Sequence, residues 1–323
     1  MKTSILKSGL IALFCCLPFF KLFGIEVKGA GRVHDPSTIV YENGRFYFFH
    51  TGRGIPAKMS PDLTNWQDLG CVYETSLSWW TNIVAGFKGF IWAPDIARFN
   101  GRWHLYYSVS SWGRNRSAIG VAVNKTIDVR GSDYKWVDGG IVIESHRSDN
   151  YNAIDPAVFV DEDNRVWLAF GSFWSGIKLI EIDPKTGKRI SSDSPIYSLA
   201  SAPNGEIEAP FIYKRGKYYY LFVNYGLCCR GISSTYNVRV GRSKDIRGPY
   251  LDKDGRDMLN GGGSLFLKSD KGEIGPGHIG IFKHQGVEYC SYHFYDPARG
   301  GLPSLSIRRI QWDTNDWLIV LKE

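Results

Sequence analysis

One pattern of apolar and polar residues recurs five times along the chain. Each copy opens on a short apolar strand, turns at Gly, Asn or charged residues, and closes with a strand rich in aromatic side chains. Gly and Asn supply the positive φ that tight hairpins require. The pattern therefore predicts five β-hairpins. They cover residues 31–51, 92–110, 155–172, 208–224 and 277–293.

Further strand signals follow the hairpins, so each repeat has room for about four short strands. The copies begin between about 50 and 70 residues apart, a spacing that suits four-stranded propeller blades with their loops. A two-layer sandwich would not need the same opening five times, and solenoid repeats are usually shorter. We therefore predict an all-β protein folded as a five-bladed β-propeller. The sequence does not indicate how the ring closes.

Composition agrees with this prediction and narrows the function. The 36 glycines and 15% aromatic residues among 323 residues are typical of an all-β chain with many tight turns. The formal net charge is +7 at pH 7, but the basic residues form no stripe and no groove motif. We therefore expect no nucleic-acid partner.

The first 24 residues resemble a secretory signal peptide. Two lysines accompany the apolar run 9–20, which is too short to span a membrane with ordinary flanks. We predict a signal peptide at 1–24, a propeller domain at 25–323, and secretion or export to the periplasm. Attachment to the cell surface through a lipidated Cys15 is an alternative, although Phe14 stands where a lipoprotein signal prefers a small residue.

Four cysteines lie beyond the leader, at positions 71, 228, 229 and 290. Neighbouring cysteines rarely satisfy the geometry of a disulfide bond. We therefore expect Cys228 and Cys229 either to bridge to distant cysteines or to remain free thiols. No spacing of Cys and His resembles a zinc site.

The innermost strands of a propeller run along its axis, so equivalent positions on them converge in space. The start of each hairpin should therefore contribute one residue to a pocket at one end of the axis. By this alignment the pocket contains Asp35, Trp92, Asp155, Glu208 and either Gly277 or His278. The last two hairpins are one residue shorter, which favours His278.

Three carboxyl groups in one pocket raise one another's pKa, and such tuning is what general acid and base catalysis needs. Glycoside hydrolysis with inversion uses one carboxylic acid to protonate the leaving oxygen and one carboxylate to deprotonate a water. Blades on opposite sides of the axis, such as the first and the fourth, would supply this couple. The third acid would then hold the proton on its neighbour.

The motifs around these acids resemble those of glycoside hydrolase family 43. The three acid motifs are Val33–Ser37, Asn152–Pro156 and Ile207–Pro210. Four further segments are similar to the endo-acting 1,5-α-L-arabinanases of that family, and the resemblance covers residues 31–323. These segments are Phe90–Asp95, Gly171–Ile177, Cys228–Tyr236 and Gly275–His278.

The resemblance implies a five-bladed propeller and a role for each acid. Asp35 would be the general base, Glu208 the general acid, and Asp155 the carboxylate that orients Glu208 and raises its pKa. Arabinanases of this group hold an ion on the axis, commonly calcium, with a His and waters around it, and His278 falls on the corresponding motif. A single His is an unusual ligand for calcium, which prefers oxygen.

Three side chains are candidates for contact with a sugar chain. Trp92 has the flat apolar face that stacks on sugar rings, and Ser172 and Trp174 lie in a motif typical of the arabinanases. Trp79 and Trp80 either line a groove or cover a blade edge.

We expect a monomeric, inverting endo-arabinanase that acts on arabinan, the polysaccharide side chain of pectin. The alternatives are an exo-acting arabinofuranosidase or β-xylosidase on the same scaffold, and a carbohydrate-binding propeller without catalysis. Exo-acting enzymes close one end of the groove with an extra loop or an added domain, and the short stretch after the fifth hairpin has neither. This favours endo action.

Overall fold

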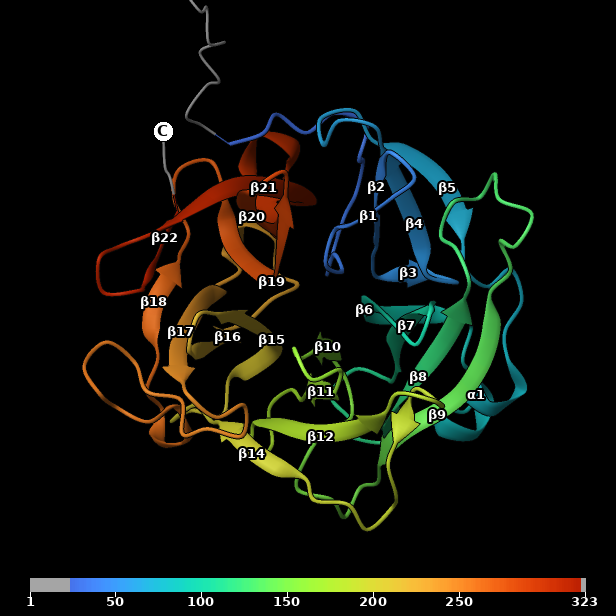
Figure 1. Cartoon of the computed structure of the whole chain (residues 1–323). Helices are drawn as coiled ribbons and strands as arrows, with labels where there is room; N and C mark the ends of the chain where they lie inside the picture. The colour runs from blue at the N-terminus through green and yellow to red at the C-terminus, as the bar shows by residue number, and fades with distance from the viewer. Residues whose placement is uncertain (1–23, 321–323) are drawn as a thin grey trace, which may run out of the picture.

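Five antiparallel sheets surround a central axis in the computed structural model, which describes residues 24–320 (Figure 1). Each sheet contains four or five strands, and consecutive segments of the chain form consecutive sheets, except that the two-residue strand β3 leaves blade 1 to pair with blade 2. The predicted five-bladed β-propeller is therefore confirmed. Apart from Gly24, the predicted signal peptide lies outside the described residues and stays a prediction.

The blades follow one another in chain order from the innermost strand outward. Blade 1 contains β1 (Val40–Glu42), β2 (Arg45–Phe49), β4 (Pro56–Ser60) and β5 (Gln67–Cys71). Blade 2 contains β3 (Gly52–Arg53), β6 (Phe90–Phe99), β7 (Arg102–Val109), β8 (Ser117–Asn124) and β9 (Val137–Ser145). Blade 3 contains β10 (Ala157–Val160), β11 (Val166–Phe170), β12 (Ile177–Asp183), β13 (Lys188–Arg189) and β14 (Tyr197–Ala200).

The last two blades complete the ring. Blade 4 contains β15 (Ile207–Arg215), β16 (Tyr218–Tyr225), β17 (Asn237–Ser243) and β18 (Ser264–Leu267). Blade 5 contains β19 (Ile274–His284), β20 (Val287–Asp296), β21 (Leu302–Trp312) and β22 (Leu318–Val320). The short helices are α1 (Ser78–Ile83) and the 3₁₀ turns η1 (Gly231–Ser233), η2 (Met258–Asn260) and η3 (Pro297–Arg299).

Aromatic side chains of the second strands pack one blade against the next. Phe46 and Phe48 of β2 are buried with Phe282 and Tyr289 of blade 5. The same arrangement recurs in β16, whose aromatic residues are buried with apolar residues of blades 3 and 5. Full burial of one such ring contributes roughly 1.5–3 kcal/mol, so these interfaces hold neighbouring blades together.

The segment before blade 1 closes the ring. The amide of Ile25 donates to the carbonyl of Ile307 in blade 5 at 2.9 Å, and the amide of Lys28 donates to the carbonyl of Thr64 in blade 1 at 2.7 Å. Further along the same segment, Ala30 and Val33 are buried in the cluster that blades 1 and 5 share. Each of the two blades keeps its own four strands, so the hydrogen bonds of this segment and the shared packing, rather than strand exchange, join them.

Near the start of every innermost strand, one residue other than glycine has a left-handed backbone conformation. The residues with positive φ are Asp35 (48°), Ala93 (44°), Asp155 (56°), Ala209 (51°) and His278 (56°). This conformation is uncommon outside glycine and concentrates at functional sites. Its fivefold recurrence defines the equivalent positions of the blades directly from the backbone.

This backbone register corrects the predicted alignment. Glu208 and Trp92 stand one residue before the left-handed position that Asp35 occupies, so their equivalent in blade 1 is His34. The pairing of both β6 and β15 shifts just after these residues, between Trp92 and Asp95 and between Glu208 and Phe211. An alignment of the repeats by residue type does not reveal this irregularity in strand pairing.

The two adjacent tryptophans cover blade 2. Trp80 is buried against Tyr107, and Trp79 stacks on the same ring with centroids 6.2 Å apart. Both belong to α1 and cover the blade. Among residues 24–320 no helix has the length and apolar character needed to cross a membrane.

Candidate active site

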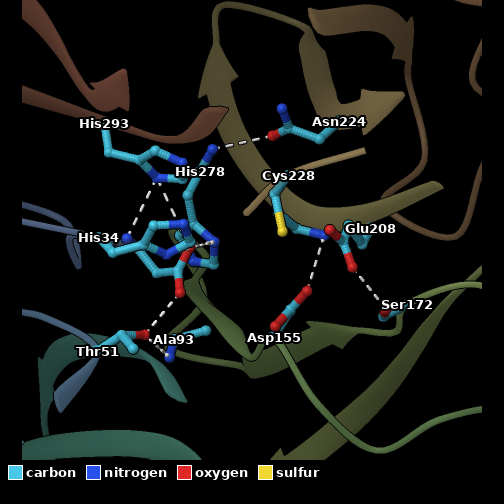
Figure 2. Close-up of polar contacts among 12 residues, drawn as sticks. His34, Thr51, Ala93, Asp155, Ser172, Glu208, Asn224, Cys228, His278 and His293 are labelled. Atoms are coloured by element: carbon cyan, nitrogen blue, oxygen red, sulfur yellow. Dashed lines mark hydrogen bonds and ion pairs between the residues drawn. The ribbon is translucent and has the colours of Figure 1, made fainter. Parts of the chain in front are cut away.

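A cavity of about 1210 Å³ lies at one end of the propeller axis. Every site residue expected from the sequence lines it: Asp35, Trp92, Asp155, Ser172, Trp174, Glu208 and His278. Close up, the histidines gather on one side of the site while Asp155, Glu208 and Ser172 lie on the other (Figure 2). Convergence of the blades thus brings together residues that are far apart in the sequence.

Asp35 is surrounded by hydrogen-bond donors and histidines. Thr51 Oγ1 donates to Oδ2 at 2.6 Å, and His34 Nδ1 lies 2.8 Å from Oδ1. The Nδ1 atoms of His278 and His293 lie 3.5 and 3.6 Å from the same oxygen. Burial alone would raise the pKa of Asp35, but electrostatic interaction with His34 and the hydrogen bond between them, with smaller contributions from the other two histidines, hold that pKa well below its usual range. Asp35 is therefore a carboxylate at neutral pH.

Glu208 and Asp155 lie in the opposite electrostatic environment. Burial raises the pKa of Glu208 to about 7, Ser172 lowers it by donating a hydrogen bond, and the negative charge of Asp35 raises it. Burial also raises the pKa of Asp155 well above its usual range, and repulsion from Glu208 adds to the effect. Two buried carboxyl groups that repel each other retain a proton between them near neutral pH.

Backbone and side-chain contacts fix both members of this pair. The amide of Ala209 donates to Asp155 Oδ2 at 3.2 Å, and Asp155's own amide donates to Ser108 Oγ at 3.0 Å. Ser172 Oγ donates to Glu208 Oε2 at 2.6 Å. Ser172 was expected to contact substrate, and its buried hydroxyl is directed at Glu208, so it acts on the carboxyl group itself.

Three of the aromatic side chains that line the cavity are tryptophans. Trp92 is half-buried, whereas Trp174 is 43% exposed. Trp112, which sequence reasoning missed, is 74% exposed and meets Trp92 edge to face with ring centroids 6.4 Å apart. Exposed aromatic faces in a cavity suit stacking on sugar rings. The sequence signal that could have identified Trp112 is its position in the loop after β7, the second strand of the blade 2 hairpin.

Asp95, also missed as a site residue, joins three blades beneath the cavity. Its carboxylate accepts from the amide of Thr38 in blade 1 at 3.0 Å and from the amide of Val158 in blade 3 at 2.9 Å. Burial raises its pKa. The two hydrogen bonds fix the first three innermost strands relative to one another, and so fix Asp35 relative to Asp155.

The expectation for the adjacent cysteines is wrong. Cys228 and Cys229 form a disulfide with each other, and Cys71 and Cys290 are free. The turn that contains the pair includes left-handed Cys229 and Gly231, so neighbouring side chains need not alternate as they do along a strand. The pair lines the cavity, with Cys229 Sγ 3.7 Å from His34 Nε2.

The residues around the axis do not fit a calcium ion held by protein oxygens. Calcium takes six to eight oxygen ligands. Within residues 24–320 two groups of three side chains could hold a metal: His34 with Cys228 and Cys229, and His34 with Asp35 and His293. His278 belongs to neither group, and only one carboxylate is present in the two. The calcium ion therefore stays a prediction, and no step below depends on a metal.

Comparison with known proteins identifies the family. The model of glycosyl hydrolases family 43 matches residues 28–318. The extracellular exo-α-(1→5)-L-arabinofuranosidase of Cellvibrio japonicus is 44% identical over 88% of this chain and 85% of its own. The extracellular endo-α-(1→5)-L-arabinanase 1 of Bacillus subtilis is also 44% identical, over 87% and 86%.

A solved structure agrees with this match at the level of the fold. The Cellvibrio cellulosa α-L-arabinanase in complex with arabinohexaose has a TM-score of 0.85 and 42% identity, over 90% of this chain and 95% of its own. Family match, sequence identity and fold therefore coincide over the segment that forms the five blades. The chain is a glycoside hydrolase and belongs to glycosyl hydrolases family 43.

Proposed function

We propose that this protein is a secreted endo-arabinanase that hydrolyses internal α-1,5 bonds of arabinan with inversion of configuration. In this mechanism Asp35 removes a proton from the attacking water, Glu208 protonates the leaving oxygen, and Asp155 keeps the proton available on Glu208. Hydrolysis with inversion needs one ionised and one protonated carboxyl group at the same pH.

The observation that carries the mechanism is the opposite pKa shift of these groups. The pKa of Asp35 lies well below its usual range, so this group accepts a proton, and the pKa of Glu208 is raised to about 7, so this group still holds one near neutral pH. A protein that only binds sugar has no need to shift its carboxyl groups in opposite directions. This assignment of base and acid agrees with the roles that the family motifs imply for Asp35 and Glu208.

Cavity size and lining support a polysaccharide substrate. About 1210 Å³ exceeds the 300–1,000 Å³ typical of pockets for single small molecules, so several sugar units fit. The exposed faces of Trp112 and Trp174 supply stacking surfaces for them. A relative of solved structure is complexed with arabinohexaose, and arabinan is accordingly our proposed substrate.

Export is supported by the disulfide and by the relatives. Disulfides form and persist in oxidising compartments outside the cytosol, and Cys228 is bonded to Cys229. The two curated relatives are named extracellular. We propose secretion, with cleavage of the leader before the ring-closing segment that begins at Ile25, and a monomeric state.

The mode of action is tested with linear arabinan. Endo action lowers the viscosity early, while few reducing ends have formed, and yields oligosaccharides of mixed length. Exo action, which the Cellvibrio japonicus relative favours as the second candidate, releases one short product while viscosity falls slowly. Proton NMR of the first anomer formed tests inversion, and the retained anomer would contradict the assigned roles.

Substrate controls complete the test. An aryl arabinofuranoside and xylan should be poor substrates for an endo-arabinanase. Rapid release of single sugars from either would favour an exo-acting arabinofuranosidase or β-xylosidase. Binding of arabinan without hydrolysis would contradict the proposed function as a whole.

A further inference from the structure

His34 contacts the candidate base and a tyrosine through its two ring nitrogens. Nδ1 lies 2.8 Å from Asp35 Oδ1, and Nε2 lies 2.8 Å from Tyr295 Oη. Only 14% of the His34 side chain is exposed, so water competes little for either nitrogen. The ring also stacks on His293 with centroids 4.1 Å apart, which limits its tilt.

Tyr295 gives this contact a direction. The backbone amide of Cys229 donates to Tyr295 Oη at 2.6 Å. A backbone N–H can only donate, so the phenol oxygen accepts there and its own proton is free for His34 Nε2. When Nε2 of a neutral imidazole accepts, the ring proton is on Nδ1, where it points to Asp35. The carboxylate of Asp35 can only accept, so its 2.8 Å contact places the ring proton of a neutral His34 on Nδ1 and leaves Nε2 as the acceptor. The donors therefore run in one direction, from Cys229 through Tyr295 and His34 to Asp35.

The second oxygen of Asp35 also accepts a hydrogen bond from a donor that a backbone amide orients. The amide of Ala93 donates to Thr51 Oγ1 at 2.8 Å, which leaves the hydroxyl proton of Thr51 for Asp35 Oδ2 (Figure 2). Each carboxylate oxygen thus receives one hydrogen bond whose direction is set by a backbone amide. Each oxygen keeps a further lone pair for a water molecule in the cavity.

We propose that Tyr295 and His34 are positioning residues that orient Asp35 toward the attacking water. This inference rests on the proposed function, in which Asp35 is the general base. Tyr295 acts through His34: it occupies Nε2, holds the proton on Nδ1 and keeps the ring in the plane that reaches Oδ1. Without the phenol, Nε2 has no donor, and the ring can rotate away from the carboxylate.

Three variants test the chain of donors. In Tyr295→Phe we expect kcat on a linear arabino-oligosaccharide to fall about tenfold to a hundredfold, the scale of a misplaced catalytic group, with KM within about twofold. His34→Leu should lose more. His34→Asn should recover at least about tenfold over His34→Leu, because its amide nitrogen occupies nearly the place of Nδ1 and donates without help from Tyr295.

Double variants separate positioning from a merely structural role. Tyr295→Phe should cause no further loss of kcat in the His34→Asn background, since residues that act in one chain are not additive. The matched control is Tyr225→Phe, whose hydroxyl bonds to the carbonyls of Ser201 and Gly262 away from the cavity. We expect normal kcat in this control. Melting temperatures identify variants that fail to fold.

The leaving group supplies an independent readout. Asp35 acts on water and not on the departing oxygen, so the loss in Tyr295→Phe should be equal for an unsubstituted arabino-oligosaccharide and for its 4-nitrophenyl glycoside. Normal kcat in Tyr295→Phe, a loss confined to KM, or additivity with His34→Asn would overturn the inference.

Asp35→Ala distinguishes failure of this inference from failure of the proposed function. If Asp35→Ala is inactive while Tyr295→Phe has normal kcat, the donor chain is wrong and the base assignment stands. If Asp35→Ala keeps its activity, the base assignment is wrong and the donor chain falls with it.

Discussion

The two sides of the cavity treat their carboxyl groups in opposite ways. Asp35 receives hydrogen bonds on both oxygens and faces three histidines, so its charged form is stabilised despite burial. Asp155 and Glu208 are buried next to each other with few donors, so their neutral forms are favoured. Burial is common to both sides. The difference teaches that the neighbours of a buried carboxyl group, here the histidines and hydrogen-bond donors around Asp35, decide whether it loses its proton.

The largest effect is expected from removing the carboxyl group of Asp35 or that of Glu208. Asp35→Ala and Glu208→Ala should each lower kcat by roughly 10²–10⁴-fold, the usual contribution of a general acid or base. With a 4-nitrophenyl leaving group, which departs without protonation, Glu208→Ala should recover much of its activity and Asp35→Ala none. Equal losses of both variants with both leaving groups would contradict the assignment of acid and base.

Asp155→Asn should lower the pKa of Glu208 without abolishing activity. Removing one of two carboxyl groups that repel each other lowers the pKa of the other. Because Glu208 must be protonated to act, kcat/KM falls as pH rises through its pKa. We expect the alkaline limb of the pH profile to move down by about one unit, the equivalent of about 1.4 kcal/mol, with a smaller loss of kcat than in Glu208→Ala. An unmoved limb would refute the coupling.

Ser172→Ala should shift the same limb in the opposite direction. The Ser172 hydroxyl donates to Glu208 Oε2 and so stabilises the charged form of that group. Its loss raises the pKa of Glu208, and the alkaline limb should move up by a few tenths of a unit to one unit. Ser175→Ala is the matched control, because Ser175 lies in the same loop and bonds to the carbonyl of Asn150. A downward shift would show that Ser172 does not donate to the acid.

Trp174→Ala should weaken substrate binding and leave the pKa values of the carboxyl groups unchanged. Loss of one stacking surface at a sugar ring costs about 0.5–1.5 kcal/mol, so KM for arabino-oligosaccharides should rise roughly threefold to tenfold. The pH profile should not move. Leu265→Ala, on the outer strand of blade 4 at 48% exposure, is the control. A shifted pH limb in Trp174→Ala would place that residue in the proton chemistry.

The fold could be predicted because each blade repeats a local pattern. Hairpin turns such as Asn43-Gly44 and Asn100-Gly101 adopt the positive φ that their residue types favour, and the aromatic strands behind them fill the blade interfaces. The convergence of the three acids on one cavity could be predicted because each lies in a recognisable motif near the start of an innermost strand. Nothing in this reasoning needs contacts between distant segments.

The parts that sequence reasoning missed depend on such contacts. Tyr295 and His293 look like ordinary residues of a packing strand, yet they face His34 and Asp35 from more than 250 positions away. The displacement of Glu208 by one residue results from a local irregularity in strand pairing that residue types do not encode. The disulfide between neighbours depends on a turn conformation that spacing rules treat as improbable.

The disulfide at the cavity wall has a practical consequence for handling the enzyme. Reduction would leave two thiols beside His34, and the three ligand atoms lie within 4.8 Å of one another. Two thiolates and an imidazole are a donor set that zinc favours. A preparation made in a reducing cytoplasm, or stored with a thiol reductant and trace zinc, would therefore be open to an inhibitor that draws His34 away from Asp35. Oxidising expression and chelator-treated buffers avoid this artefact.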